Sequence, residues 1–400
     1  MSPLIYGYVT ALAAMVACGS SSASRPSDGG SDGGDDRCSR EFSSVNVTDI
    51  DRDGNPDLLR TNNGLVSVRL GNGDGTFRSP VQLSRVVAVP PSIVLDVNGD
   101  GRPDVVTCGV LPFDGGWAVG VALSNNDLTL QDKIDYPTQY SCSFIAAGDI
   151  NHDNTIDFMM LTSTSAKTIG DSAVRISVLL GNGDGTFRAG EDSIVEILHS
   201  YVESMSMSVT DINGDGNLDI VAPDEGGDSR GQFVNLLLGN GDGTFRSPGA
   251  AAVTAVDPRV AAVADVNRDG MPDIVTANYS GNSVSVNLGS SLGSFQSPIN
   301  YAISNPRGMQ IADVSDDGKL DIVVVNLDLA RVLLGNGDGT FKAKVEYPIP
   351  GMDGVGQLVV TDITSDGKLD LLLPNKNSGE LYVMLGNGDG TFQSPRCVPD

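Results

Sequence analysis

The sequence predicts an all-β protein, a seven-bladed β-propeller built from four-stranded antiparallel blades. Three observations support this prediction. An acidic nine-residue loop recurs seven times, starting at Asp49, Asp96, Asp149, Asp211, Asp265, Asp313 and Asp362. A short apolar run and then a glycine-rich turn follow each loop. A repeat spacing of 47 to 62 residues in a chain of 400 indicates one repeat array rather than several unrelated domains.

Each repeat contains residues for about four short strands. In the first repeat we expect strands at 43–49, 57–61 and 65–70, with a further strand after the turn at 71–77. The runs after the loops are β-branched or leucine-rich and only four to six residues long, which is typical of buried strands and not of helices. Each small sheet leaves an apolar face exposed, and a closed ring lets every blade cover the next one.

The acidic loops have the composition of a site for a hard cation. The fourth loop reads DINGDGNLD, with oxygen-bearing side chains at positions one, three, five and nine around a glycine that allows a tight turn. Calcium takes six to eight oxygen ligands. The sequence therefore predicts up to seven Ca²⁺ ions, held by Asp49, Asp51, Asp53, Asp57; Asp96, Asn98, Asp100, Asp104; Asp149, Asn151, Asp153, Asp157; Asp211, Asn213, Asp215, Asp219; Asp265, Asn267, Asp269, Asp273; Asp313, Ser315, Asp317, Asp321; and Asp362, Thr364, Asp366, Asp370.

An EF-hand begins with the same spacing, but it requires a bidentate glutamate at position twelve and flanking helices. Position twelve here holds Arg60, Thr107, Met160, Ala222, Thr276, Val324 and Leu373, and the flanking segments are strand-like. Both features exclude the EF-hand. The alternative, acidic turns that hold no metal, remains open at this stage.

The companion turn, LGNGDGTF, starts at Leu70, Leu180, Leu238, Leu334 and Leu385, and it has degenerate copies at Leu123 and Leu288. No lysine follows its glycines and no helix is expected after it, so the pattern does not indicate a phosphate-binding loop. We expect a turn with a conformational role.

The N-terminal segment carries an apolar run, Leu4 to Ala17, which we interpret as an export signal over residues 1–18. Its end resembles a bacterial lipoprotein cleavage box, which implies lipidation of Cys18, although no basic residue precedes the run and Met15 replaces the usual leucine. Ordinary secretion and a segment without an export role are the alternatives. Residues 19–37 are expected to form a flexible Ser/Gly/Asp tether, and residues 38–400 the propeller.

If Cys18 carries lipid, four cysteines remain. In an oxidising compartment an even number is expected to pair. The repeat geometry favours Cys38 with Cys397, joining the two ends of the ring, and Cys108 with Cys142, joining consecutive repeats. Buried free thiols are the alternative.

The formal charge is −26, and seven divalent cations would reduce it to −12. Such an acidic chain should repel nucleic acid and anionic membrane surfaces. We therefore expect no nucleic-acid partner, membrane contact only through a lipid anchor, and a monomer.

The repeated pattern over Phe42 to Pro395 resembles the FG-GAP and VCBS-type repeats and is similar to the calcium-binding blades of the integrin α-chain head. This resemblance implies a seven-bladed propeller with Ca²⁺ in its blade hairpins, used for adhesion or recognition by extracellular proteins. The chain lacks the Phe-Gly and Gly-Ala-Pro boxes, so the bacterial VCBS-type form is the better match.

Ligand binding is expected on the face opposite the acidic loops, where the connections of repeats two to four are longest. They carry Phe113, Trp117, Asp224 and Arg230. The expected function is recognition or adhesion toward a protein or glycan by an exported protein, either an envelope lipoprotein or an extracellular one. No nucleophile motif or other catalytic arrangement supports the alternative of a polysaccharide lyase or dehydratase acting through these loops, and a purely structural envelope protein is a third possibility.

Overall fold

The computed structural model describes residues 44–62, 65–84, 89–110, 116–125, 127, 129–139, 141–163, 174–190, 193–195, 207–223, 233–246, 253–254, 256–290, 294–354, 356–375 and 377–398. Every regular element in these ranges is a β-strand, which confirms the predicted all-β class. Within them, no helix has the length and apolar character that a membrane span needs.

Seven small antiparallel sheets follow one another along the chain, and we call them blades 1 to 7. Blade 1 contains β1 (Ser44–Thr48), β2 (Asp57–Asn62), β3 (Leu65–Arg69) and β4 (Val81–Ser84). Blade 2 contains β5 (Val89–Leu95), β6 (Asp104–Val110), β7 (Trp117–Ala122) and β8 (Ile134–Thr138). Blade 3 contains β9 (Ser141–Gly148), β10 (Asp157–Ser163), β11 (Val174–Gly181), β12 (Phe187–Ala189) and β13 (Ser193–Val195). Blade 4 contains β14 (Ser208–Thr210), β15 (Asp219–Pro223), β16 (Phe233–Gly239), β17 (Phe245–Arg246) and β18 (Val253–Thr254).

The last three blades keep the same order. Blade 5 contains β19 (Pro258–Ala264), β20 (Asp273–Asn278), β21 (Ser283–Asn287) and β24 (Ile299–Ala302), with a small pair, β22 (Gly289–Ser290) and β23 (Ser294–Phe295). Blade 6 contains β25 (Gly308–Ala312), β26 (Asp321–Val325), β27 (Leu329–Leu333) and β28 (Val345–Pro348). Blade 7 contains β29 (Val359–Thr361), β30 (Asp370–Pro374), β31 (Leu381–Met384) and β32 (Arg396–Val398).

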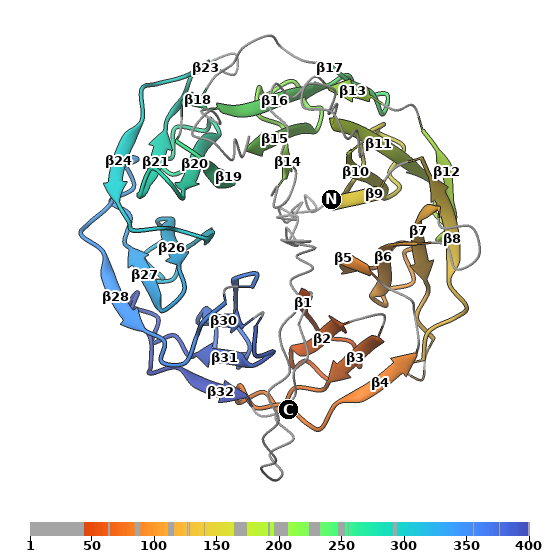
Figure 1. Ribbon diagram of the computed structural model, residues 1–400, viewed down its shortest axis with the longest axis horizontal. Helices are drawn as coiled ribbons and strands as arrows, with labels where there is room; N and C mark the ends of the chain where they lie inside the picture. Colours follow the sequence, from red (N-terminus) through yellow and green to blue (C-terminus); the bar gives the residue numbers. More distant parts are fainter. Residues whose placement is uncertain are drawn as a thin grey trace, which may run out of the picture.

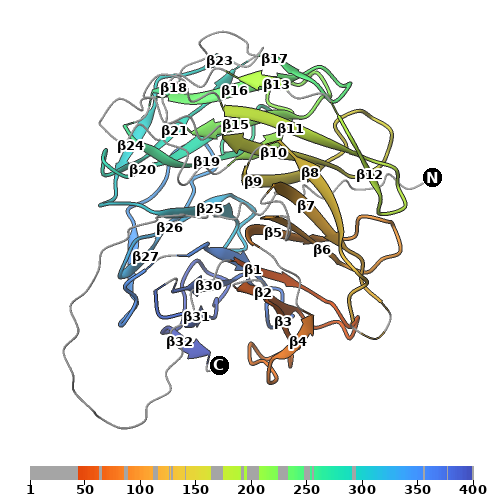
Figure 2. The ribbon, with the colours of Figure 1, turned by 45° about the vertical axis from the view of Figure 1, so that its right-hand side comes forward.

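The blades form a closed ring around a central axis, so the chain is a seven-bladed β-propeller as predicted (Figure 1). The first strand of each blade is innermost and the fourth strand lies on the circumference (Figure 1). Each acidic loop joins the first strand to the second, and consequently all seven loops lie on one side of the ring, which we call the loop face. The opposite side, which carries the connections between second and third strands, is the far face. Figure 2 shows the ring from an oblique direction.

The core lies between the blades. One buried cluster combines Met159 and Ile176 of blade 3 with Ile220 and Leu237 of blade 4, and equivalent clusters occupy the other junctions. The second strands are buried on both faces, which explains why their sequences are continuous apolar runs and do not alternate. Burying each such side chain contributes about 1.5–3 kcal/mol relative to exposure, so stability depends on each blade having a neighbour.

Aromatic contacts reinforce several of these junctions. Tyr136 of blade 2 meets Phe187 of blade 3 edge to face at 5.7 Å between ring centroids, and its hydroxyl accepts the Phe187 N–H at 3.1 Å. Tyr301 and Phe341 repeat the arrangement between blades 5 and 6, at 5.8 Å and 2.8 Å. The phenylalanine of the companion turn is therefore a contact to the preceding blade.

A disulfide joins Cys108 on β6 to Cys142 on β9, with 5.8 Å between the Cα atoms. It links blades 2 and 3, as the sequence analysis expected. Cys397 lies on β32, and its predicted partner Cys38 lies outside the described residues. That pairing stays a prediction.

The ring closes between blade 7 and blade 1, and none of the described strands is exchanged between these two blades. Apolar residues of both blades pack in one cluster that includes Val45, Leu58, Leu372 and Val383. On the loop face, the Arg396 guanidinium donates hydrogen bonds to the carbonyl oxygens of the blade 1 companion turn, 2.6 Å to Gly75 and 3.4 Å to Asp74.

We predict that Arg396→Ala lowers the free energy of unfolding by about 1 to 3 kcal/mol, because it removes hydrogen bonds from a charged donor at the ring closure. Urea denaturation measures the change. The matched control is Arg188→Ala, which truncates an exposed arginine on the outer strand of blade 3 and should change stability by less than about 0.5 kcal/mol. Equal stability of the two variants would contradict the role of Arg396 in closure.

Candidate metal centres

The ninth residue of every acidic loop is a buried aspartate at the start of the second strand of its blade. The seven residues are Asp57, Asp104, Asp157, Asp219, Asp273, Asp321 and Asp370, each at most 1% exposed. One oxygen of each carboxylate accepts the N–H of the second loop residue, at 2.7 to 3.1 Å. The other accepts the N–H of a residue in the companion turn, at 2.7 to 2.8 Å. The aspartate therefore joins the acidic loop to the companion turn.

Burial raises the pKa of all seven of these carboxyl groups, against the lowering effect of the backbone hydrogen bonds. For Asp104, Asp157 and Asp219 the pKa rises to about 6. Neighbouring acids of the same loop add to the shift, as Asp215 and Asp211 do for Asp219. A nearby cation would favour the ionised form of these groups.

The first, third and fifth positions are arranged by backbone hydrogen bonds within the loop. In the fourth loop, Asp211 accepts the N–H groups of Asp215 at 3.1 Å and Gly216 at 2.8 Å. Asn213 accepts the Asp215 N–H at 2.8 Å, and Asp215 accepts the Asn217 N–H at 2.9 Å. These contacts hold the acidic side chains around one turn of the backbone.

The sixth position needs a left-handed backbone. Gly216 has φ of +91°, a conformation that only glycine adopts without cost. The third loop has Asn154 at this position with φ of +64°, and asparagine tolerates that region better than most residues.

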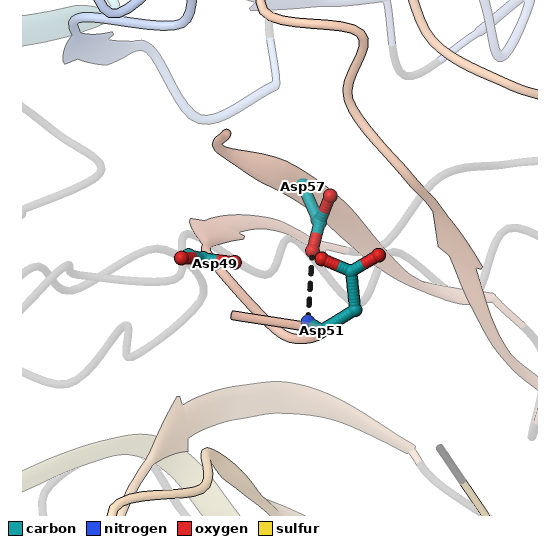
Figure 3. Close-up of side chains that lie close together, drawn as sticks. All are labelled: Asp49, Asp51 and Asp57. Atoms are coloured by element: carbon teal, nitrogen blue, oxygen red, sulfur yellow. Dashed lines mark hydrogen bonds between the residues drawn. The ribbon is translucent and has the colours of Figure 1, made fainter. Parts of the chain in front are cut away.

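The first loop has the largest number of carboxylates at the predicted ligand positions. Asp49, Asp51 and Asp57 each offer an oxygen atom such that these atoms lie within 4.8 Å of one another (Figure 3). The Asp51 N–H also lies 3.4 Å from Asp57 Oδ2. Asp53, the fourth predicted ligand, is not part of this group. Three converging carboxylates fit the oxygen donors that calcium prefers, and an oxygen that already accepts one hydrogen bond retains a second lone pair.

In the other loops, hydrogen bonds or ion pairs within the loop offset part of the negative charge of the fifth-position aspartate. In loops two to five, the third-position asparagine donates its amide N–H to the fifth-position aspartate at 2.9 to 3.1 Å. In loops two, six and seven, a basic seventh residue pairs with the same aspartate, namely Arg102, Lys319 and Lys368. The hydrogen bond and charge of Lys319 hold the pKa of Asp317 below its usual value. These loops consequently repel less when no cation is bound.

The fourth loop position connects neighbouring loops. Arg52 donates to the Asp100 carbonyl at 3.1 Å, His152 Nε2 lies 2.9 Å from Asn217 Oδ1, and Ser365 donates to the Gly54 carbonyl at 3.3 Å. His152 is exposed at the surface. It joins the third loop to the fourth, and sequence spacing could not show this because its partner lies 65 residues away.

The companion turn has the predicted conformational role. In the turn of blade 4, Asp242 accepts both the N–H and the hydroxyl of Thr244 at 2.9 and 2.6 Å. These two bonds lower the pKa of Asp242. Asn240 donates to the Thr244 hydroxyl at 2.8 Å. The polar side chains of the motif are therefore occupied within the turn.

Of the four residues predicted to bind a ligand on the far face, the structure describes only Trp117. Trp117 was expected in a loop, but it is the half-buried first residue of β7, paired with Val110 and Thr138. Phe113, Asp224 and Arg230 lie outside the described residues, as does Cys18. Their roles stay predictions.

A family model described as an FG-GAP-like repeat matches six segments of the chain, at 49–107, 96–160, 168–222, 211–276, 265–324 and 313–373. The matches begin at acidic loops in five of the six cases. No protein of curated function matches the chain significantly.

Solved structures with the same fold include an Agrocybe aegerita lectin that recognises non-reducing terminal N-acetylglucosamine. It is 20% identical with a TM-score of 0.54, and the match covers 89% of this chain and 94% of the lectin. A Pseudomonas aeruginosa periplasmic gluconolactonase is 14% identical with a TM-score of 0.57, over 90% and 96% of the two chains. A Desulfotomaculum acetoxidans protein of unknown function is 12% identical with a TM-score of 0.52, over 84% and 97%. These likenesses establish the fold.

We predict that Asp219→Asn destabilises the protein by about 1 to 3 kcal/mol even in the presence of a chelator. The amide would place an N–H against one of two buried backbone donors, which leaves that donor unsatisfied. The matched control, Asp215→Asn, changes an exposed acid of the same loop and should shift stability by less than about 0.5 kcal/mol under those conditions. Denaturation in urea distinguishes them, and equal effects would contradict the connecting role of Asp219.

Proposed function

The chain belongs to the FG-GAP-like repeat family, and from this premise we propose that it is an exported, calcium-stabilised propeller that recognises a protein or glycan ligand. The observation that carries the proposal is the sevenfold acidic loop, in which backbone hydrogen bonds already hold the oxygen donors around one turn. Asp49, Asp51 and Asp57 supply the most complete set of donors.

In each loop the calcium ion would be held by the side chains at positions one, three, five and nine. Bound calcium would supply two positive charges beside carboxylates that otherwise repel one another. The ninth aspartate would then couple the ion to the companion turn, because the same carboxylate accepts hydrogen bonds from both segments. Calcium binding would accordingly stiffen the whole loop face.

Recognition fits a rigid ring with connections of unequal length on the face that the acidic loops do not use. Binding residues often lie on loops held by such a scaffold. A lectin has the same fold, which shows that this architecture can present a glycan site. Recognition is therefore the first function to test.

Export is supported by the apolar N-terminal segment and by the disulfide between Cys108 and Cys142. Disulfides persist in oxidising compartments and are rare in the cytosol. Lipidation of Cys18 would place the propeller on the cell envelope, beyond the tether of residues 19–37.

The second candidate is an enzyme acting on carbohydrate, since a gluconolactonase also has this fold. The two functions differ in outcome, because a recognition module retains its ligand unchanged whereas an enzyme releases a product.

We predict that calcium raises the melting temperature and that a chelator lowers it. Each occupied site would contribute about 1 to 3 kcal/mol at calcium concentrations of 10 to 100 times its dissociation constant. Magnesium should stabilise less, since it requires a smaller, near-octahedral set of ligands. Asp51→Asn should reduce the calcium response more than it reduces stability in chelator. Superimposed melting curves with calcium and with chelator would remove calcium from the proposal.

A glycan array probed with labelled protein at saturating calcium tests recognition. We expect a subset of glycans to be retained, and mass spectrometry of the eluted glycans should find them unchanged. A shortened, unsaturated or ring-opened product would identify an enzyme instead. No retained ligand on the array or in a pull-down of cell-surface proteins would contradict recognition.

A further inference from the structure

Blades 5 and 6 bring two arginines onto one tyrosine at the far face. The Arg259 guanidinium carbon lies 3.8 Å from the centroid of the Tyr279 ring, and that of Arg307 lies 5.0 Å from it. Arg307 also donates a hydrogen bond to the Tyr279 hydroxyl at 3.2 Å. All three side chains are partly exposed. We call these three residues the arginine cluster.

The two arginines occupy equivalent positions in consecutive repeats. Each lies six residues before the first aspartate of its acidic loop and directly after a proline. The residue before that proline has a left-handed backbone in both blades, Asp257 with φ of +57° and Asn305 with φ of +44°. The same local turn thus delivers a guanidinium at the start of the innermost strand in two adjacent blades (Figure 1).

Hydrogen bonds from both blades hold the segments that carry the cluster. The Tyr279 N–H donates to the Asp257 carbonyl at 2.9 Å, and the Arg307 N–H donates to the Val325 carbonyl at 2.9 Å. Asn282 accepts the Asn305 N–H at 2.9 Å through its side chain. The cluster is therefore preorganised, and a ligand would lose little free energy in ordering it.

The cluster has unused capacity for an anion. Arg307 Nη2 is bonded to Tyr279, and its Nε is buried without a hydrogen-bond partner among the described residues, so an anion would meet the partly exposed remainder of the guanidinium. Two cations on one ring also repel each other, and an anion between them would relieve that repulsion. The nearby acid, Asp257, accepts the Ser280 hydroxyl with one carboxylate oxygen. A guanidinium matches the planar geometry of a carboxylate.

We propose that the arginine cluster binds the carboxylate of an acidic sugar, such as a single uronic acid residue on an otherwise neutral glycan. The far-face connections into and within blades 5 and 6 expose Ser280, Ser304 and Asn305, whose hydroxyl and amide groups suit sugar hydroxyls. They also expose Val256 (46%) and Leu327 (39%), which suit the apolar face of a sugar ring. The net charge of −26 opposes a polyanionic partner, which favours a single acidic residue over an acidic protein segment.

This site deepens the proposed recognition function and rests on it. The test is isothermal titration calorimetry at saturating calcium with cellobiouronic acid, which is glucuronic acid linked to glucose. Cellobiose is the matched neutral probe, because it differs only in carrying CH₂OH in place of the carboxylate. We expect binding of the acid to be at least tenfold tighter than that of cellobiose, and to weaken as salt is raised.

Two variants test the residues. Arg307→Gln should weaken binding of cellobiouronic acid at least tenfold, and Arg307→Lys should weaken it less, because lysine keeps the charge but lacks the planar donors. Arg188→Gln removes an exposed arginine on the outer strand of blade 3 and should leave binding unchanged. Melting curves establish that each variant is folded, so that loss of binding is not loss of structure.

Equal affinity for the acid and for cellobiose, no binding of either, or unchanged binding by Arg307→Gln would overturn the site. Tighter binding of a tetraglutamate peptide would assign the cluster to an acidic protein partner and overturn the glycan assignment. If the array identifies a ligand whose binding Arg307→Gln does not affect, recognition stands and this site does not. An array without any ligand would instead contradict the proposed function itself.

Discussion

The hydrogen bonds of one buried aspartate per blade hold the loop face together. The carboxylate of Asp219 joins the second residue of its acidic loop to Gly239 of the companion turn, and the other six blades repeat this contact. Asp219 and Gly239 are 20 residues apart in sequence. Because an acceptor-only carboxylate satisfies two backbone donors, no amide or hydroxyl of similar size replaces it. The same residue is therefore both a structural connection and a predicted metal ligand.

The far face is held by a different side chain. Asn326 ends the turn between β26 and β27 by accepting the Leu329 N–H at 3.0 Å, and it donates to the Ser304 carbonyl of the preceding connection at 3.2 Å. Asn375 makes the same kinds of contact in blade 7, to Ser378 and to Gly351. Blades 2, 3 and 4 have no asparagine at this position, and they carry the longest connections. The reversal between the second and third strands therefore takes one of two forms, a short turn held by an asparagine or a long connection without it.

The sequence was sufficient for the propeller because its evidence is local and repeated, with a loop, a buried run and a turn in each unit. The connecting role of the ninth aspartate was missed, since the pattern shows an oxygen donor but not which backbone groups it accepts. The partner of His152 and the asparagines of the far face were missed for a related reason. Each contact joins segments that only the curvature of the ring brings together. Trp117 was placed in a loop because strand β7 begins earlier than its apolar residues indicated.

The acidic loops differ in how much of their negative charge is offset within the loop, and the loop with the least internal compensation lies at the ring closure. Loop one carries four aspartates at the predicted ligand positions and has neither the third-position amide nor the basic seventh residue that relieve charge elsewhere. It also lies at the closure, where Ser365 contacts the Gly54 carbonyl. The closure joins blade 7 to blade 1, and no strand of the described ranges is shared between them. A cation in loop one would therefore stabilise the junction between blades 7 and 1, so the charge of this loop bears directly on the closure of the ring.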